Sequence, residues 1–165
     1  MATEQGERKE HLRTRLMRGR EVFLAAVAAL DEVDMAKPVQ TDGATWAARD
    51  LVGHVAYAEV GMVGLIRATL AGAPPQADPA FDLDRFNEGR VRRAREQEFP
   101  ALLERLAASR EAVLVLLDGL TDADLDRAAH HPVLRETTVE GIFRVMPLHD
   151  RQHAQDLAAL RGTAT

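Results

Sequence analysis

The sequence predicts an all-α protein built as a four-helix bundle, and three observations support this prediction. Alanine and leucine, two strong helix formers, supply 28 and 20 of the 165 residues, whereas glycine and proline together supply 18. Apolar residues recur three and four positions apart in four separate segments, which is the spacing of one helix face. The connections between these segments are long, so we expect at least one crossover connection and almost no strand.

The first predicted helix runs from about Glu7 to Glu32. One face of this helix is apolar, formed by Leu12, Leu16, Gly19, Phe23, Ala26 and Leu30. A loop is predicted next, because Lys37-Pro38 and Thr41-Asp42-Gly43 contain residues that interrupt regular structure.

The second helix is predicted from about Trp46 to Ala71, with the hydroxyl of Thr45 as its N-terminal cap. Its apolar face consists of Ala47, Leu51, His54, Ala58, Gly61, Leu65 and Ala68. Gly72-Ala73-Pro74-Pro75 ends this helix, and the segment to Pro79 is predicted to be a linker-like loop.

The third helical segment is predicted from about Leu83 to Leu120, with a break or bend at Pro100. Its apolar face consists of Phe99, Leu102, Leu106, Ser109, Val113, Leu116 and Leu120. A short helix is predicted to start at Thr121-Asp122-Ala123-Asp124 and to end at His130-His131-Pro132.

The last helix is predicted from Thr137, which forms a capping-box pattern with Glu140, to about Arg161. Pro147 lies inside this helix and is predicted to kink it. The residues of its inward face are Val139, Ile142, Met146, His149, His153, Asp156 and Leu160.

Composition limits the classes of function. The length suits a single domain over residues 1–165, with short flexible tails at both ends. A net charge of −5 and seven aromatic residues argue against nucleic acid as a partner.

We expect no membrane partner and a cytoplasmic location, because no apolar run approaches about 20 residues and residues 1–20 lack a secretion signal. With no cysteine, any metal must be held by His, Asp or Glu.

Three of the six histidines fall on apolar helix faces. His149 and His153 are four residues apart, so they lie about one turn apart on the same side of the last helix. His54 lies on the apolar face of the second helix, between Leu51 and Ala58. If these two faces meet inside the bundle, three imidazoles converge, and three histidines with one open position are typical of a catalytic metal site.

The spacing leaves an alternative open. A histidine on an apolar face is more often a hydrogen-bonded core residue than a metal ligand, although burying three unpaired imidazoles is costly. The remaining histidines, His11, His130 and His131, are expected to be solvated, because they lie at a charged helix start and in a loop before proline.

Two short motifs resemble those of the DinB-like, YfiT-related superfamily. The stretch from Trp46 to His54 reads WAARDLVGH and resembles the W-x-x-x-[DE]-x-x-x-H pattern at the start of the second helix. The stretch from His149 to His153 reads HDRQH and resembles the H-[DE]-x-x-H pattern near the end. Phe86-Asn87 and the segment 117–125 also agree, so the resemblance covers roughly residues 8–161.

This resemblance implies a four-helix bundle that binds a divalent metal, zinc or nickel, through His54, His149 and His153. It also implies one of several enzymatic activities. Relatives include bacillithiol S-transferases and mycothiol-dependent maleylpyruvate isomerases, which use a low-molecular-weight thiol, and enzymes that hydrolyse small substrates. We therefore expect a metal-dependent thiol S-transferase acting on a small molecule. The alternatives are a metal-dependent hydrolase and a non-catalytic bundle that binds a ligand or a protein.

Further residues are candidates for supporting such a site. Asp50, Asp150 and Asp156 lie near the three histidines in sequence, and a carboxylate could fix the tautomer of an imidazole ligand. The substrate-binding candidates are Tyr57, Asn87 and Arg90.

The residues Arg90, Arg92, Arg93 and Arg95 form the one basic cluster in the sequence. Either Arg90 or Arg93 contacts an anionic substrate, or the whole cluster is a solvated face paired with Glu88 and Glu96. Apolar residues off the main helix faces, such as Val22, Val27, Leu103 and Leu114, make a homodimer a further possibility.

Overall fold

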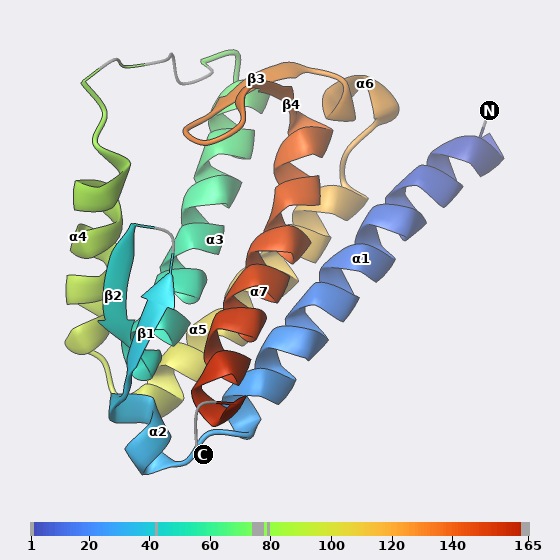
Figure 1. Cartoon of the computed structure of the whole chain (residues 1–165). Helices are drawn as coiled ribbons and strands as arrows, with labels where there is room; N and C mark the ends of the chain where they lie inside the picture. Colours follow the sequence, from blue (N-terminus) through green and yellow to red (C-terminus); the bar gives the residue numbers. More distant parts are fainter. Residues whose placement is uncertain (1, 42, 74–77, 79, 163–165) are drawn as a thin grey trace.

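Four long helices form the body of the protein, as the sequence predicts (Figure 1). The computed structural model describes residues 2–41, 43–73, 78 and 80–162. The four helices are α1 (Ala2–Ala28), α3 (Ala48–Leu70), α5 (Phe99–Asp118) and α7 (Val139–Gly162). The bundle predicted from the four apolar faces is therefore confirmed.

The four helices run as two parallel pairs. α1 and α7 are parallel, because Arg8 pairs with Glu140 near one end and Arg161 donates to the carbonyl of Ala29 at the other. α3 and α5 are also parallel, and they run opposite to α1 and α7 (Figure 1). Helix α4 (Leu83–Arg95) makes this possible, because it carries the chain back along α3 before α5 begins. The crossover expected from the long connections is thus this helix.

Proline ends one predicted helix and is tolerated in another. The segment predicted over residues 83–120 is split into α4 and α5, and Pro100 lies in the first turn of α5, where a missing N–H costs nothing. Pro147, by contrast, lies inside α7, which is a single helix from Val139 to Gly162. Its ring packs directly against Gly19 of α1, where a Cβ atom would lie 2.7 Å from the Cβ of Pro147.

Two short β-hairpins replace connections that were predicted as loops or helix ends. Strand β1 (Pro38–Thr41) pairs antiparallel with β2 (Ala44–Ala47), and β3 (Ala128–His131) pairs antiparallel with β4 (Arg135–Thr138). Each hairpin leads directly into a long helix, α3 or α7. The sequence analysis missed both hairpins, because four-residue strands give too short an alternation to detect.

The hairpins also correct two predicted helix caps. Thr45 lies in β2 and its hydroxyl accepts a hydrogen bond from the side chain of Gln40, while Ala47 precedes α3 without a side-chain cap. Thr137 lies in β4, and it is the hydroxyl of Thr138 that accepts a hydrogen bond from the backbone N–H of Gly141.

Two shorter helices complete the chain. Helix α6 (Asp122–Leu125) begins at a capping box formed by Thr121 and Asp124, where a short helix was predicted. Helix α2 (Glu32–Ala36), capped by Asp31, lies in a stretch that was predicted as the end of the first helix and a loop. Part of the predicted linker, residues 74–77 and 79, lies outside the described residues.

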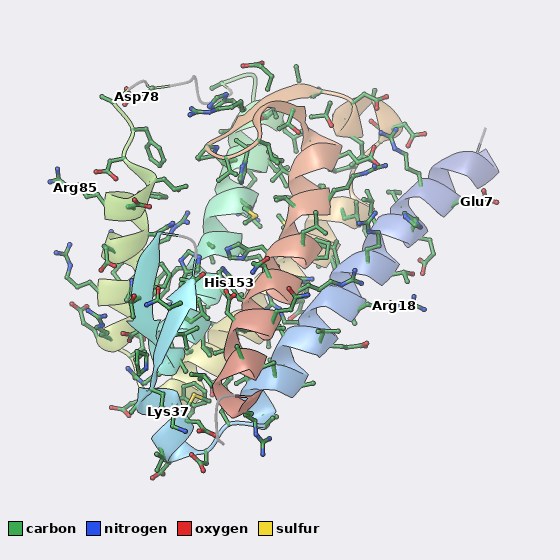
Figure 2. All side chains as sticks on the ribbon, in the orientation of Figure 1. Glu7, Arg18, Lys37, Asp78, Arg85 and His153 are labelled. Atoms are coloured by element: carbon green, nitrogen blue, oxygen red, sulfur yellow. The ribbon has the colours of Figure 1, made fainter. Side chains whose placement is uncertain are left out.

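The core lies between the four long helices, and side chains from all of them fill it (Figure 2). Fully buried members include Phe23, Leu51, Ile66, Phe143 and Leu157. Val27, predicted to lie off the main helix faces, is also buried, whereas Val22 and Leu103 are exposed.

By length and composition alone, α3 could cross a membrane, which the sequence analysis did not anticipate. Its most apolar window is 61% buried inside the bundle. Burial of this kind is expected of a helix in a bundle core, and α3 still exposes Val60, Gly64 and Arg67.

Candidate metal centre

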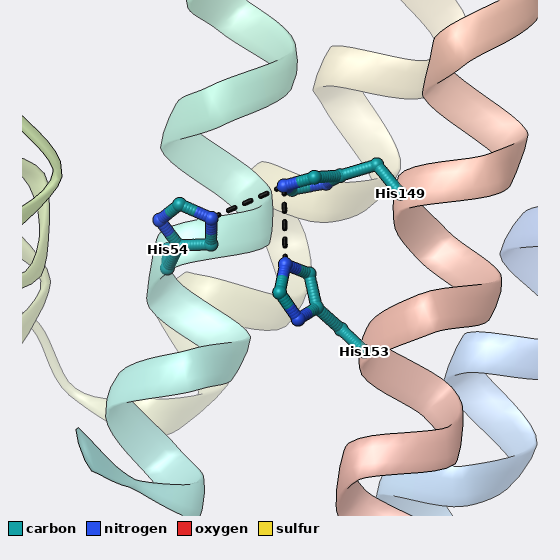
Figure 3. A group of neighbouring side chains, drawn as sticks. All are labelled: His54, His149 and His153. Carbon is teal, nitrogen blue, oxygen red and sulfur yellow. Dashed lines mark hydrogen bonds between the residues drawn. The ribbon is translucent and has the colours of Figure 1, made fainter. Parts of the chain in front are cut away.

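The structure brings His54, His149 and His153 together in the space between α3 and α7 (Figure 3). The Nε2 atom of His149 lies 3.1 Å from the Nε2 atom of His54 and 3.1 Å from that of His153. One ligand atom from each ring lies within 4.8 Å of the others. Because α3 and α7 are antiparallel, one histidine on α3 faces the pair that is one turn apart on α7.

A carboxylate orients one of the three rings. The Nδ1 atom of His153 lies 2.9 Å from a carboxylate oxygen of Asp156, and the hydroxyl of Thr41 donates to the same oxygen at 3.1 Å. A carboxylate holds the proton on Nδ1, so the Nε2 atom carries the lone pair on the side of the other two rings. Of the three candidate carboxylates, Asp156 is the one that the structure places against an imidazole.

Burial favours the neutral form of His54 and His149. The pKa of His54 is lowered to about 3, mainly by burial and further by His153 and Arg90. The pKa of His149 is lowered well below its ordinary value by burial first and then by the neighbouring histidines and arginines. Neutral imidazoles are the form that binds a metal, so this environment favours ligation at neutral pH.

The ring of His54 is packed on one side and unsatisfied at one nitrogen. The indole of Trp46 lies against it, with 4.9 Å between ring centroids, and the indole N–H donates to the carboxylate of Glu88. The Nδ1 atom of His54 is buried without a hydrogen-bond partner in the structure. A ligand held at Nε2 would place the ring proton on Nδ1, which has no acceptor among the described residues.

Asp50 and Asp150 are committed elsewhere. Asp50 pairs with Arg95 of α4 at 2.7 Å. Asp150 is buried and pairs with Arg20 and Arg110. It lies next to His149 in sequence, but neighbouring residues on a helix point about 100° apart, so its side chain faces α1 and α5. The prediction that these two carboxylates support an imidazole is therefore corrected.

A cavity of about 350 Å³ opens beside the three histidines. Its lining includes all three of them, Trp46, and the predicted substrate-binding residues Asn87 and Arg90. Burial lowers the pKa of Arg90 to about 10, so its guanidinium is still charged at neutral pH. The third candidate, Tyr57, does not line this cavity; its ring lies under the guanidinium of Arg105, 4.5 Å away.

The β3–β4 hairpin forms another wall of the cavity and corrects a prediction about its histidines. His131 is only 7% exposed and His130 is partly buried, and both line the cavity. They were expected to be solvated, because the preceding helix was predicted to end in an open loop. His11 is exposed, as expected.

Several cavity residues were not predicted as such from the sequence, among them Gly61, His131 and Thr41. Gly61 and His131 are single residues whose roles depend on distant segments. Thr41 was detectable in principle, because Asp42-Gly43 is a common turn of a two-residue hairpin, and that hairpin directs Thr41 toward Asp156.

The comparisons with known proteins agree with this arrangement. The model of the DinB superfamily matches residues 15–157. The chain belongs to the DinB superfamily. No curated protein matches the chain.

Solved structures of DinB-like proteins share the fold. YfiT from Bacillus subtilis, described as a probable metal-dependent hydrolase with an unusual four-helix bundle topology, is 20% identical, with a TM-score of 0.74 over 93% of this chain and 86% of that one. The mycothiol-dependent maleylpyruvate isomerase is 15% identical, with a TM-score of 0.74 over 90% of this chain. This chain spans only 60% of the isomerase.

A third neighbour corrects the expectation that nucleic acid is excluded as a partner. The colibactin self-resistance protein ClbS, solved in complex with a dsDNA, is 14% identical, with a TM-score of 0.75 over 95% of this chain and 97% of that one. A protein with this fold has thus been solved with DNA, so the exclusion based on net charge and aromatic content is withdrawn. Those criteria apply to proteins that coat nucleic acid through many phosphate contacts.

Proposed function

We propose that the protein is a metal-dependent enzyme that transfers a low-molecular-weight thiol to a small electrophilic substrate. In this proposal His54, His149 and His153 hold a divalent ion, zinc or nickel, and a bacillithiol- or mycothiol-like thiol is the cosubstrate. Thiols of this kind are kept reduced inside cells, which fits a cytoplasmic location.

One observation carries this proposal: three imidazoles converge through their Nε2 atoms, and Asp156 fixes the proton of one of them on the far side. Without a metal, Nε2 of His149 lies 3.1 Å from two other Nε2 atoms, and with a single proton or a single lone pair it can make a full hydrogen bond to one of them. Three nitrogen donors with an open side suit zinc or nickel. The donor set therefore fits a metal.

When bound, the ion would supply a Lewis acid that lowers the pKa of a thiol or water in contact with it. The chain provides the surroundings. Trp46 and the apolar residues of the cavity exclude water from one side of the histidines. Because the chain has no cysteine, a thiol nucleophile must enter through the cavity as a cosubstrate.

The competing activity is hydrolysis, since the same donor set could activate water. The two activities differ in their products. A transferase consumes one thiol for each electrophile and forms a thioether, whereas a hydrolase leaves the thiol concentration unchanged. The absence of cysteine makes this measurement clean, because every thiol in the assay belongs to the cosubstrate.

The experiment combines metal analysis with thiol consumption. Wild type, His54→Ala, His149→Ala and the control His11→Ala are expressed without a His-tag in medium with zinc and nickel. We expect about one equivalent of metal in wild type and His11→Ala and a sharp loss in the other two. With metal-loaded protein, bacillithiol or mycothiol and an electrophile such as monochlorobimane, we expect thiol consumption that depends on His54 and His149.

Two results would contradict the proposal at different levels. Equal metal content in all four proteins, or none in any, would remove the metal site itself. Metal bound through His54 and His149, with turnover of an ester substrate but no thiol consumption, would replace the transferase with a hydrolase.

A further inference from the structure

Arg90 is a cavity cation without a carboxylate partner among the described residues. Its guanidinium donates to the side-chain oxygen of Asn87 at 3.3 Å and lies over the ring of Phe86, 4.2 Å from the centroid. The two buried arginines of the core, Arg20 and Arg110, each pair with two carboxylates. Partial burial of an unpaired guanidinium is costly, and an anion in the cavity would offset that cost.

The backbone of α3 is shaped to admit this guanidinium. Gly61 lies seven residues, about two helical turns, beyond His54, and a Cβ atom at position 61 would overlap Nη2 of Arg90. Any other residue there would push the guanidinium away from α3. Glycine in the middle of a helix weakens it, so a close approach of this kind is a reason for its presence.

A second donor lies in the wall that the β3–β4 hairpin forms in the same cavity. The Nδ1 atom of His131 accepts hydrogen bonds from the backbone N–H groups of Val133 and Leu134, at 3.2 and 3.3 Å. The neutral ring must therefore carry its proton on Nε2. His131 is buried and lines the cavity together with Arg90. The cavity thus offers a partly buried cation at Arg90, an exposed one at Arg135 and a neutral N–H donor at His131.

The rest of the lining selects the type of anion. Much of it is apolar, contributed by Met62, Leu65, Phe81, Phe86, Pro132 and Val133. The exposed charges in the lining are the carboxylates of Asp78 and Asp84 and the guanidinium of Arg135, so they add one net negative charge and disfavour a multiply charged ligand. A single negative charge on an apolar body matches this combination better than a phosphate does.

We propose that the substrate is an organic carboxylic acid, whose carboxylate is bound by Arg90 and His131 while its apolar part lies against the Phe86 side of the cavity. This inference rests on the proposed function, because it places the reacting part of the acid beside the three histidines. A guanidinium can bind a carboxylate through two parallel hydrogen bonds, so Arg90 both holds and orients the substrate.

Trp46 provides the measurement. It is the single tryptophan of the chain, it lines the cavity, and its fluorescence can be excited at a wavelength that phenyl groups do not absorb. The probes are phenylacetate, its uncharged isostere phenylacetamide, and inorganic phosphate. Each is titrated into the metal-loaded protein and into the same protein treated with EDTA.

We expect phenylacetate to bind both forms and to bind at least tenfold more tightly than phenylacetamide or phosphate. Arg90→Ala should weaken phenylacetate binding by tenfold or more, because it removes a charge-assisted hydrogen bond. Gly61→Ala should weaken it in the same direction by displacing the guanidinium. Arg92→Ala is the matched control, since Arg92 is an exposed arginine of the same helix, and should leave binding within twofold of wild type.

The outcomes separate this inference from the proposed function. Equal binding of phenylacetate and phenylacetamide to wild type would overturn the carboxylate site, whatever the variants do. Phosphate binding as tight as that of phenylacetate would also overturn it. Binding that survives Arg90→Ala but is lost with EDTA or in His54→Ala would place the carboxylate on the metal, which refutes the role of Arg90 and leaves the metal site standing.

Discussion

Helix α7 takes part in two buried polar clusters, and they differ in how completely their groups are paired. The first, which we call the core ion cluster, consists of Arg20, Glu59, Arg110 and Asp150. Arg20 donates to Glu59 at 2.9 Å and to Asp150 at 3.2 Å, and Arg110 contacts both carboxylates as well. Two positive and two negative charges balance, and Ser109 adds a hydrogen bond to Glu59.

The second cluster, the three histidines, begins one residue away at His149 and is not balanced in this way. Its three Nε2 atoms face one another, and each neutral ring has only one proton to donate. It also adjoins a cavity, whereas the core ion cluster is closed by α1, α3, α5 and α7. A saturated polar cluster serves the fold, while an unsaturated one beside a cavity is suited to a ligand.

The largest expected effect on stability comes from a substitution that breaks the core ion cluster. Asp150→Ala leaves Arg20 and Arg110 buried with Glu59 as their one remaining carboxylate in the cluster, and an uncompensated buried charge costs about 3–5 kcal/mol. We expect the free energy of unfolding, measured by urea denaturation with EDTA present, to fall by about that amount. His149→Ala under the same conditions should cost much less, because it removes no charge partner.

The control for this experiment is Asp118→Ala, which removes an exposed ion pair with Arg13. Exposed pairs contribute about 0–1 kcal/mol, so this variant should unfold nearly as wild type does. A loss for Asp150→Ala no larger than that for Asp118→Ala would show that the core ion cluster does not stabilise the fold.

The same contrast explains what the sequence could reveal. The helix faces are periodic, so the positions of His54, His149 and His153 on inward faces could be predicted from spacing alone. Asp150 could not be assigned, because its partners come from α1 and α5, 130 and 40 residues away in the chain. Asp156, three residues after His153, could be named as a candidate, but only the structure distinguishes it from Asp50 and Asp150.

The cavity walls were harder to predict than the histidines. They come from two hairpins of four-residue strands and from α4, whose approach to α3 depends on small residues at contact points. Gly53 meets Ala94, and Gly61 meets Arg90. Such contacts depend on how two helices pack, and the hydrophobic pattern of either helix alone does not contain that information.

A second prediction concerns the pH dependence of stability, which we expect from the histidine cluster. The pKa values of His54 and His149 are lowered in the folded protein, so these rings take up protons when the protein unfolds below about pH 6.5. The unfolded state then binds more protons, and stability falls as pH falls. Each histidine that stays neutral should lower the free energy of unfolding by about 1.4 kcal/mol between pH 8 and pH 5.5.

Urea denaturation with EDTA at pH 8 and pH 5.5 measures this effect. The stability loss begins near pH 6.5, the ordinary histidine pKa. The lower value, pH 5.5, lies above the range in which most carboxylates titrate, so carboxylates add little to the difference. His54→Phe should remove part of the dependence. Equal free energies at the two pH values, or an unchanged dependence in His54→Phe, would show that the histidines are not held neutral by the fold.

The smallest expected effect concerns Asp156, the carboxylate that contacts a ring of the histidine cluster. Asp156→Asn keeps the shape of the side chain but removes the charge that holds the proton of His153 on Nδ1, so Nε2 becomes a weaker ligand. We expect zinc affinity, measured with a competing chelator, to fall about 10–100-fold, which is about 1.4–2.7 kcal/mol.

Gln152→Ala is the matched control, because Gln152 contacts the other oxygen of Asp156 from the exposed side, and it should change the affinity less than twofold. If Asp156→Asn binds zinc as tightly as wild type does, the carboxylate does not set the tautomer of His153, and its contact with the ring is structural in the same sense as the contacts of Asp150.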